Sequence, residues 1–109
     1  DQATRVLIAL LRSNPHSAIA DQAWFWLGEA RYLLSAFSEA VEAFETLLLY
    51  FDDSRLVPSA KLKLGLTQVE LRQFEAARET FNELLSEKVD DRIKLTAQEA
   101  LGRVDAAGF

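Results

Sequence analysis

The chain of 109 residues contains no cysteine and no methionine, and it has only four glycines, two prolines and one histidine. Without cysteine the protein can form neither a disulfide framework nor a thiolate metal site, and cysteine usage gives no sign of its redox compartment. The scarcity of glycine and proline leaves room for few turns, which favours a small number of long helices. Because the sequence starts at Asp1 and lacks methionine, we expect it to be a piece of a longer protein.

Basic residues are also outnumbered, since the chain has 17 acidic residues and 12 basic ones, which give a formal net charge of -5. A protein that binds nucleic acid needs a basic face to neutralise phosphate, so this balance argues against a nucleic-acid partner. It also disfavours electrostatic docking onto anionic lipid. No run of the sequence approaches the roughly 18 apolar residues of a membrane span, so we expect no direct membrane insertion.

Groups that could support catalysis are missing or scattered. His16 lies in a junction beside Pro15, and no serine is placed with it in the manner of a nucleophilic triad. There is no glycine-rich phosphate loop and no metal-ligand spacing. Glu39, Glu42 and Glu45 recur every three residues, which is more typical of a solvated helix face than of a carboxylate pair. We therefore predict no catalytic, cofactor-binding or metal-binding residues, and no enzyme activity.

What the sequence does contain is a pattern that repeats at one fixed interval. Alanine, leucine and glycine recur together every 37 residues, at Ala23, Leu27 and Gly28, at Ala60, Leu64 and Gly65, and at Ala97, Leu101 and Gly102. A period of this size indicates stacked supersecondary units, each of which buries its apolar face on the next. The repeat therefore predicts a solenoid, a class of fold that usually provides binding surfaces.

Each half of the repeating unit has the apolar spacing of a helix. Ala40, Phe44 and Leu47 recur at intervals of three and four residues, which places them on one stripe of a helix. Such stripes and the breaks between them predict six helices, over residues 2–13, 18–34, 37–51, 55–71, 74–87 and 91–106. Pro15 interrupts the first helix, and Ser17 is expected to cap the second. Short turns make neighbouring helices antiparallel, so we predict an all-α solenoid of helix hairpins.

The period also divides the chain into units. We expect a single domain, 1–109, with a half repeat at 1–17, full repeats at 18–54 and 55–91, and a C-terminal capping helix at 92–109. The glycine after each leucine is expected to let the paired helix approach closely, with Ala40 and Ala77 as the matching small residues. Phenylalanines such as Phe44 and Phe81 are expected to fill the space between consecutive pairs.

The spacing of these positions resembles the tetratricopeptide repeat, a helix-turn-helix unit of about 34 residues. The signature positions are Trp24, Leu27, Gly28, Tyr32, Ala40 and Phe44 in one unit, and Leu64, Gly65, Ala77 and Phe81 in the next. The chain departs from the family in its longer period and in Lys61 and Gln98, which replace the first aromatic residue. The resemblance implies a non-enzymatic scaffold that binds a protein or peptide partner.

The longer period narrows the resemblance. The junction at residues 14–17, followed by the aromatic-rich segment 23–28, is similar to repeats of bacterial cell-envelope proteins. Among these are the C-terminal domains of the periplasmic Tol–Pal-associated cell-division coordinators and, less closely, the lipoproteins of the outer-membrane barrel assembly complex. This resemblance implies a periplasmic location and a role in envelope assembly or division. A self-association module, or an accessory domain of a larger enzyme, is the alternative.

In a tetratricopeptide stack the first helix of each pair lines the concave face, which implies a groove for the partner. The residues expected on that face are Gln22, Phe25, Glu29, Tyr32, Leu62, Leu66, Val69 and Arg103. Phe25 and Tyr32 would anchor the partner, because exposed apolar strips often mark interaction sites. The alternative is that the solenoid itself buries this strip.

Two further features have competing interpretations. Trp26 is expected to pack against the preceding unit, and the alternative places it at the rim of the groove. Residues 6–11 are apolar on all sides, and the helix that would pair with this segment lies upstream of Asp1. We therefore expect the open side of the first helix to pair with a second copy, giving a homodimer or a swapped arrangement. The alternative is that Ile8 alone is exposed.

Overall fold

The computed structural model describes residues 1–107, which form six α-helices and no β-strand. The helices are α1 (Gln2–Ser13), α2 (Ala20–Leu33), α3 (Phe37–Tyr50), α4 (Val57–Glu70), α5 (Phe74–Leu85) and α6 (Asp91–Ala106). Their ends lie within two residues of the predicted ones, and the prediction of an all-α solenoid is confirmed. The last two residues of the predicted capping segment, 108 and 109, lie outside the described part.

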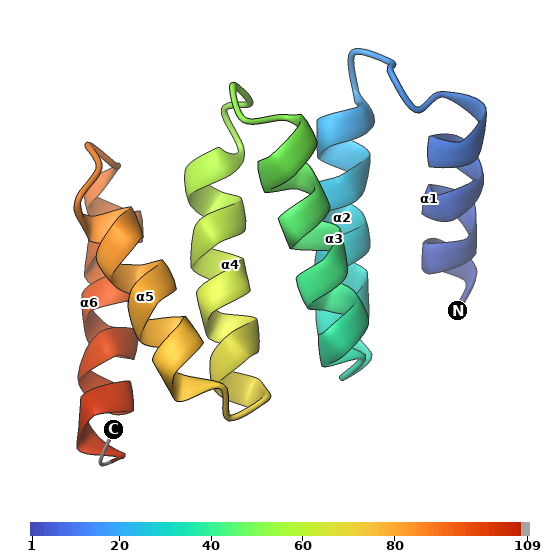
Figure 1. Ribbon diagram of the computed structural model, residues 1–109. Coiled ribbons are helices and arrows are strands. Elements are labelled where there is room, and N and C mark those ends of the chain that lie inside the picture. Colours follow the sequence, from blue (N-terminus) through green and yellow to red (C-terminus); the bar gives the residue numbers. More distant parts are fainter. Residues whose placement is uncertain (108–109) are drawn as a thin grey trace.

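The helices form a row that runs from α1 at one end to α6 at the other and point alternately up and down, with α3 drawn in front of α2 and α5 in front of α6 (Figure 1). Each helix packs against the next one along the chain. In addition, α2 contacts α4 and α4 contacts α6, whereas α1, α3 and α5 make no such contacts with one another in the described residues. The row therefore curves toward α2, α4 and α6, whose common side we call the concave face.

Two glycines fix how closely the helices of a pair approach. A Cβ atom added at Gly28 would lie 2.5 Å from Cε1 of Phe44, and one added at Gly65 would lie 2.5 Å from Cε1 of Phe81. Both phenylalanines are 0% exposed. The close approach was predicted, but its partner was not. The ring of a phenylalanine supplies the three atoms nearest to each added Cβ.

Gly102 does not share this environment. No atom lies within 4 Å of the place where its Cβ would stand. The reason is that α6 is the last helix of the described part, so no following helix brings a phenylalanine against it. The expected equivalence of the three glycines therefore holds for the first two pairs only.

The position of the first aromatic residue of the repeat is occupied by Lys61 in the second unit. Its Nζ atom lies 3.0 Å from Oε1 of Glu83 and donates a hydrogen bond to Glu87, so it links α4 to the end of α5. Burial disfavours the charged form of Lys61, but these acidic partners outweigh burial and raise the pKa of the ammonium group. An ion pair thus replaces the aromatic contact between the two helices.

At the junction before α2, the structure differs from the prediction that the Ser17 side chain caps this helix. The second helix begins without a side-chain cap, and the Ser17 hydroxyl is buried with no hydrogen-bond partner, so the predicted cap is wrong. At the matching position, the Ser54 hydroxyl donates to Oδ2 of Asp21 over 2.6 Å and accepts from the Leu56 amide over 3.1 Å. This contact ties the start of α4 to the start of α2.

The glycine contacts lead to a prediction about stability. Gly28→Ala and Gly65→Ala are each expected to lower the free energy of unfolding by about 1–3 kcal/mol, because the added methyl group meets a buried ring. Gly102→Ala is expected to raise it by about 0.5–1 kcal/mol, since alanine favours a helix and has open space there. Urea unfolding in dilute solution, followed by circular dichroism, measures all three. An equal response at the three positions would contradict the proposed packing.

Candidate functional site

One recess of the concave face lies between the C-terminal ends of α2 and α4 and the middle of α6. It has a volume of about 310 Å³, and we call it the C-terminal recess. The residues that line it are Tyr32, Leu66, Val69, Glu70, Thr96, Ala100 and Arg103. Four of the eight predicted groove residues are therefore brought together here, from α2, α4 and α6. The floor is largely apolar, and the charged groups come from Glu70 and Arg103.

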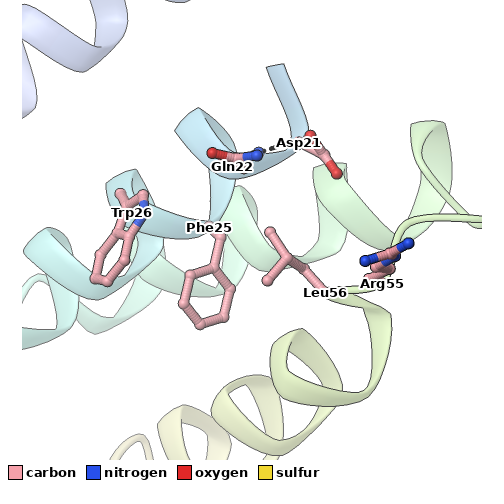
Figure 2. Close-up of a pocket in the computed structure, with 6 residues that line it drawn as sticks. All are labelled: Asp21, Gln22, Phe25, Trp26, Arg55 and Leu56. Atoms are coloured by element: carbon pink, nitrogen blue, oxygen red, sulfur yellow. Dashed lines mark hydrogen bonds between the residues drawn. The ribbon is translucent and has the colours of Figure 1, made fainter. Parts of the chain in front are cut away.

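A second recess lies between the starts of α2 and α4, and we call it the N-terminal recess (Figure 2). It has a volume of about 540 Å³ and is lined by Asp21, Gln22, Phe25, Trp26, Arg55 and Leu56. Trp26 lies at one end and Arg55 at the other, with Phe25 and Leu56 between them. The hydrogen bond from Ser54 to Asp21 holds the two helix starts in place beside this recess.

An ion pair joins α2 and α4 between the two recesses. Glu29 Oε1 lies 3.5 Å from the Nζ atom of Lys63, and both residues are half-buried. Gln22, Phe25, Glu29 and Tyr32 follow one another at intervals of three and four residues, so they share one stripe of α2. The two recesses therefore lie along the same side of this helix, with a polar contact at its middle.

Phe25 does not stand exposed as predicted. Its side chain is 9% exposed, and its ring meets the ring of Phe44 edge-on with centroids 6.0 Å apart. It belongs to a buried cluster that joins α2, α3 and α4. Leu62 likewise packs against the core formed by α5 and α6. The solenoid itself therefore buries Phe25 and Leu62, as the alternative interpretation expected, because contacts between neighbouring units cover them.

Trp26 differs from its prediction in the opposite sense: it was expected to pack against the preceding unit, but it is exposed. Its side chain is 57% exposed, and its ring contacts Phe25 edge-on at 5.6 Å. Trp24 packs instead against the cluster shared with α1. Residues two positions apart point about 200° away from each other on a helix, so the two tryptophans face opposite sides. The alternative, in which Trp26 lies at the rim of the groove, is the one observed.

Tyr32 supplies a polar group to the C-terminal recess. Its ring meets that of Phe37 edge-on, with centroids 5.4 Å apart. Burial, together with the negative charges of Glu70 and Glu29, raises the pKa of the phenol, while Arg103 acts weakly in the opposite direction. The hydroxyl group therefore remains protonated at neutral pH and can donate a hydrogen bond to a guest.

Several residues in and between these recesses were missed by the sequence analysis, namely Asp21, Arg55, Leu56, Lys63, Thr96 and Ala100. The sequence did contain a signal for some of them, namely the 37-residue period. Trp26, Lys63 and Ala100 follow one another at the 37-residue period, so the stripe could have been extended to include them. Arg55 and Leu56 precede α4, and the contact between α2 and α4 alone brings them to the recess.

Within residues 1–107, no three acidic or histidine side chains gather closely enough to hold a metal ion. None of the helices in this range is both long and apolar enough to cross a membrane. The concave face carries apolar, hydroxyl, amide and charged groups, and among the charged ones Glu29 and Lys63 form an ion pair.

Comparison with known families agrees with this architecture. A family model described as "Tetratricopeptide repeat" matches residues 1–61 and, in a second register, residues 35–92. The chain belongs to the tetratricopeptide repeat family. No curated protein matches the chain, so the family model alone carries this assignment. Tetratricopeptide repeats in general are non-enzymatic units that mediate protein–protein interaction, commonly through a concave surface.

Phe25 and Trp26, which are neighbours on the concave side of α2, should respond differently to substitution by alanine. Phe25→Ala is expected to lower the free energy of unfolding by about 3–5 kcal/mol, because it empties a buried site. Trp26→Ala is expected to change it by only about 0.5 kcal/mol, as is usual for surface residues. Urea unfolding of both variants checks this. A stable Phe25→Ala variant would show that the ring is not part of the core.

The raised pKa of Tyr32 predicts how stability depends on alkaline pH. Below a pH of about 10, the usual pKa of tyrosine, Tyr32 is protonated in both states and contributes no pH dependence. Above it, the unfolded chain loses this proton before the folded protein does, so the free energy of unfolding falls. Tyr32→Phe is expected to reduce this fall, whereas Tyr50→Phe at an exposed site serves as the control. Denaturant titrations across this pH range compare the three proteins, and identical profiles would refute the assignment.

Proposed function

We propose that the concave face binds an extended segment of a partner protein, so that the protein acts as a non-enzymatic scaffold. The observation that carries this proposal is the alignment of two recesses on the side toward which the row of helices curves. Each recess combines an apolar floor with a few charged or hydroxyl groups. That composition is typical of protein interfaces, whose apolar centre is surrounded by polar groups.

The geometry indicates what kind of segment fits. Gln22 and Tyr32, which lie in different recesses, are ten residues apart on α2, which is about 15 Å along the helix axis. An extended peptide spans this distance with about five residues. The expected guest therefore carries two apolar or aromatic side chains about that far apart, with polar residues between them. Those central residues would face the ion pair of Glu29 and Lys63.

We further propose that the partner belongs to the bacterial cell envelope, where the protein would act in the periplasm during envelope assembly or division. Support comes from the junction at residues 14–17 followed by the aromatic-rich segment 23–28, which is similar to the repeats of the Tol–Pal-associated cell-division coordinators. Affinity capture from separate periplasmic and cytoplasmic fractions tests this placement. Capture of specific partners from the cytoplasmic fraction alone would contradict it.

Peptides selected from a random displayed library provide a direct test of the groove. Trp26→Ala and Arg103→Glu each remove an exposed side chain from one recess, and each is expected to weaken peptide binding at least about fivefold. The double variant should lose binding further. Fluorescence anisotropy of a labelled peptide, at low protein concentration, measures the dissociation constant.

Matched controls lie on helices that do not form the concave face. Glu42→Ala and Glu79→Ala change exposed residues of α3 and α5 that are 37 positions apart in the repeat. They are expected to bind the selected peptides as the unmodified protein does. If these two variants weaken binding, or if the double variant of Trp26 and Arg103 binds normally, the peptide site lies elsewhere.

A further inference from the structure

The side of α2 that faces away from the concave face carries a recess of a different kind. It has a volume of about 350 Å³, at the lower end of the roughly 300–1,000 Å³ typical of binding pockets. The residues that line it are Pro15, His16, Trp24, Thr46, Tyr50 and Phe51, and we call it the aromatic recess. Because Trp24 and Trp26 face opposite sides of α2, this recess is separate from the two recesses of the concave face.

Two side chains of the aromatic recess combine an apolar ring with a hydrogen-bond donor. Tyr50 is 72% exposed and Trp24 is half-buried. Within residues 1–107, neither the Tyr50 hydroxyl nor the Trp24 indole N–H has a hydrogen-bond partner. A polyproline II helix suits such a surface, because its backbone makes no internal hydrogen bonds and its carbonyl groups can accept from these donors. Its proline rings pack on aromatic side chains, so the recess has the chemistry of a site for a proline-rich guest.

The aromatic recess continues into a second one, because Trp24 lines both. This neighbour lies between α1 and α3 and has a volume of about 320 Å³; besides Trp24, it is lined by Ile8, Leu11, Arg12, Leu27, Arg31 and Glu42. We call it the basic recess, and the two together the outer groove. Ile8 is half-buried here whereas Val6 is 57% exposed, so the expectation that Ile8 alone is exposed on the first helix is wrong.

Two arginines give the basic recess its charge. Arg12 and Arg31 form no ion pair in the part of the chain that the structure describes, although Arg31 donates a hydrogen bond to the backbone oxygen of Glu39 over 3.0 Å. They outnumber the acidic side chain that lines this recess, Glu42. In a chain with a formal net charge of -5, this end of the outer groove therefore favours a negatively charged group.

The next unit of the repeat has neither feature at the same positions. Residues 12, 24, 31, 46 and 50 of the outer groove correspond, one period later, to Leu49, Lys61, Gln68, Glu83 and Glu87. There Lys61 forms ion pairs with both acids and so links α4 to the end of α5. The second unit thus folds without these aromatic rings and arginines. Because folding of the repeat does not require them, they are available to bind a partner.

We propose that the outer groove binds a proline-rich segment of a partner protein that carries an acidic residue. Trp24 and Arg31 are seven residues apart on α2, which is about 10.5 Å along the helix axis. A polyproline II helix rises about 3.1 Å per residue, so it covers this distance with about three or four residues. The acidic residue is therefore expected at about that separation from the proline that meets Trp24. The site is independent of the concave face, and both can be occupied in one molecule.

Two labelled hexapeptides test the chemistry of the guest. They are Pro-Pro-Pro-Pro-Glu-Glu and its reverse, Glu-Glu-Pro-Pro-Pro-Pro, which present the acidic end in either direction. At least one is expected to bind at a single site, as measured by fluorescence anisotropy. Replacing its prolines by alanine, or its glutamates by glutamine, is expected to weaken binding at least about fivefold. Failure of both peptides to bind at millimolar protein, or equal binding of either replaced version, would overturn the proposal.

Variants that copy the next unit test where the guest binds. Trp24→Lys, Thr46→Glu and Tyr50→Glu together introduce the ion-pairing residues found one period later, so this triple variant is expected to fold but to bind at least about tenfold more weakly. Tyr50→Glu alone changes an exposed residue and is expected to weaken binding as well. Arg31→Gln copies Gln68 and is expected to weaken binding of the glutamate peptide but not of its glutamine version.

The concave-face variants Trp26→Ala and Arg103→Glu serve as controls. They are expected to bind the proline peptide as the unmodified protein does, whereas the outer-groove variants should keep binding the peptides selected on the concave face. Circular dichroism of every variant verifies the helical fold. If the folded triple variant or Tyr50→Glu binds the proline peptide normally, or if Trp26→Ala alone abolishes its binding, the guest does not dock in the outer groove.

Discussion

The contact of a phenylalanine ring with a glycine backbone is the constraint on which the rest of this structure depends. Phe44 and Phe81 lie so close to Gly28 and Gly65 that no side chain fits between them. Phe44 also belongs to the cluster that reaches α4, so one ring sets the spacing within its own pair and toward the next. The curvature that brings α2 beside α4, and with it the concave face, follows from this spacing.

Contacts of this kind are local, and the sequence therefore predicts the helices well. Apolar residues every three or four positions locate all six helices, because the pattern that buries a stripe is the pattern that defines the helix. The turns were harder to foresee. Ser35 and Arg72, 37 residues apart, both have positive φ angles of about 60° in the turns within a pair. Glycine usually marks such turns, and neither residue is glycine.

The candidate site could be predicted only in part, for a related reason. Periodicity identifies the stripe of α2 that includes Phe25, Glu29 and Tyr32, but it does not tell how much of that stripe the next unit covers. Phe25 becomes buried because α3 and α4 meet it, and Trp26, one position later, is left in the recess. The ion pair of Glu29 with Lys63 likewise exists only because α2 and α4 bring together two residues that are 34 positions apart in the sequence.

The row of helices has a mechanical consequence. Since each helix touches only its neighbours and next neighbours, no single element holds the whole molecule together. The curvature of such a row follows from small rotations at successive helix contacts, so a small change at each contact would alter the bend while every helix stays intact. The hydrogen bonds of Asp21, Ser54 and Leu56 tie the starts of α2 and α4 together at one edge. Bending would therefore open the opposite edge, near Tyr32 and Val69, more readily, allowing guests of different bulk to be accommodated there.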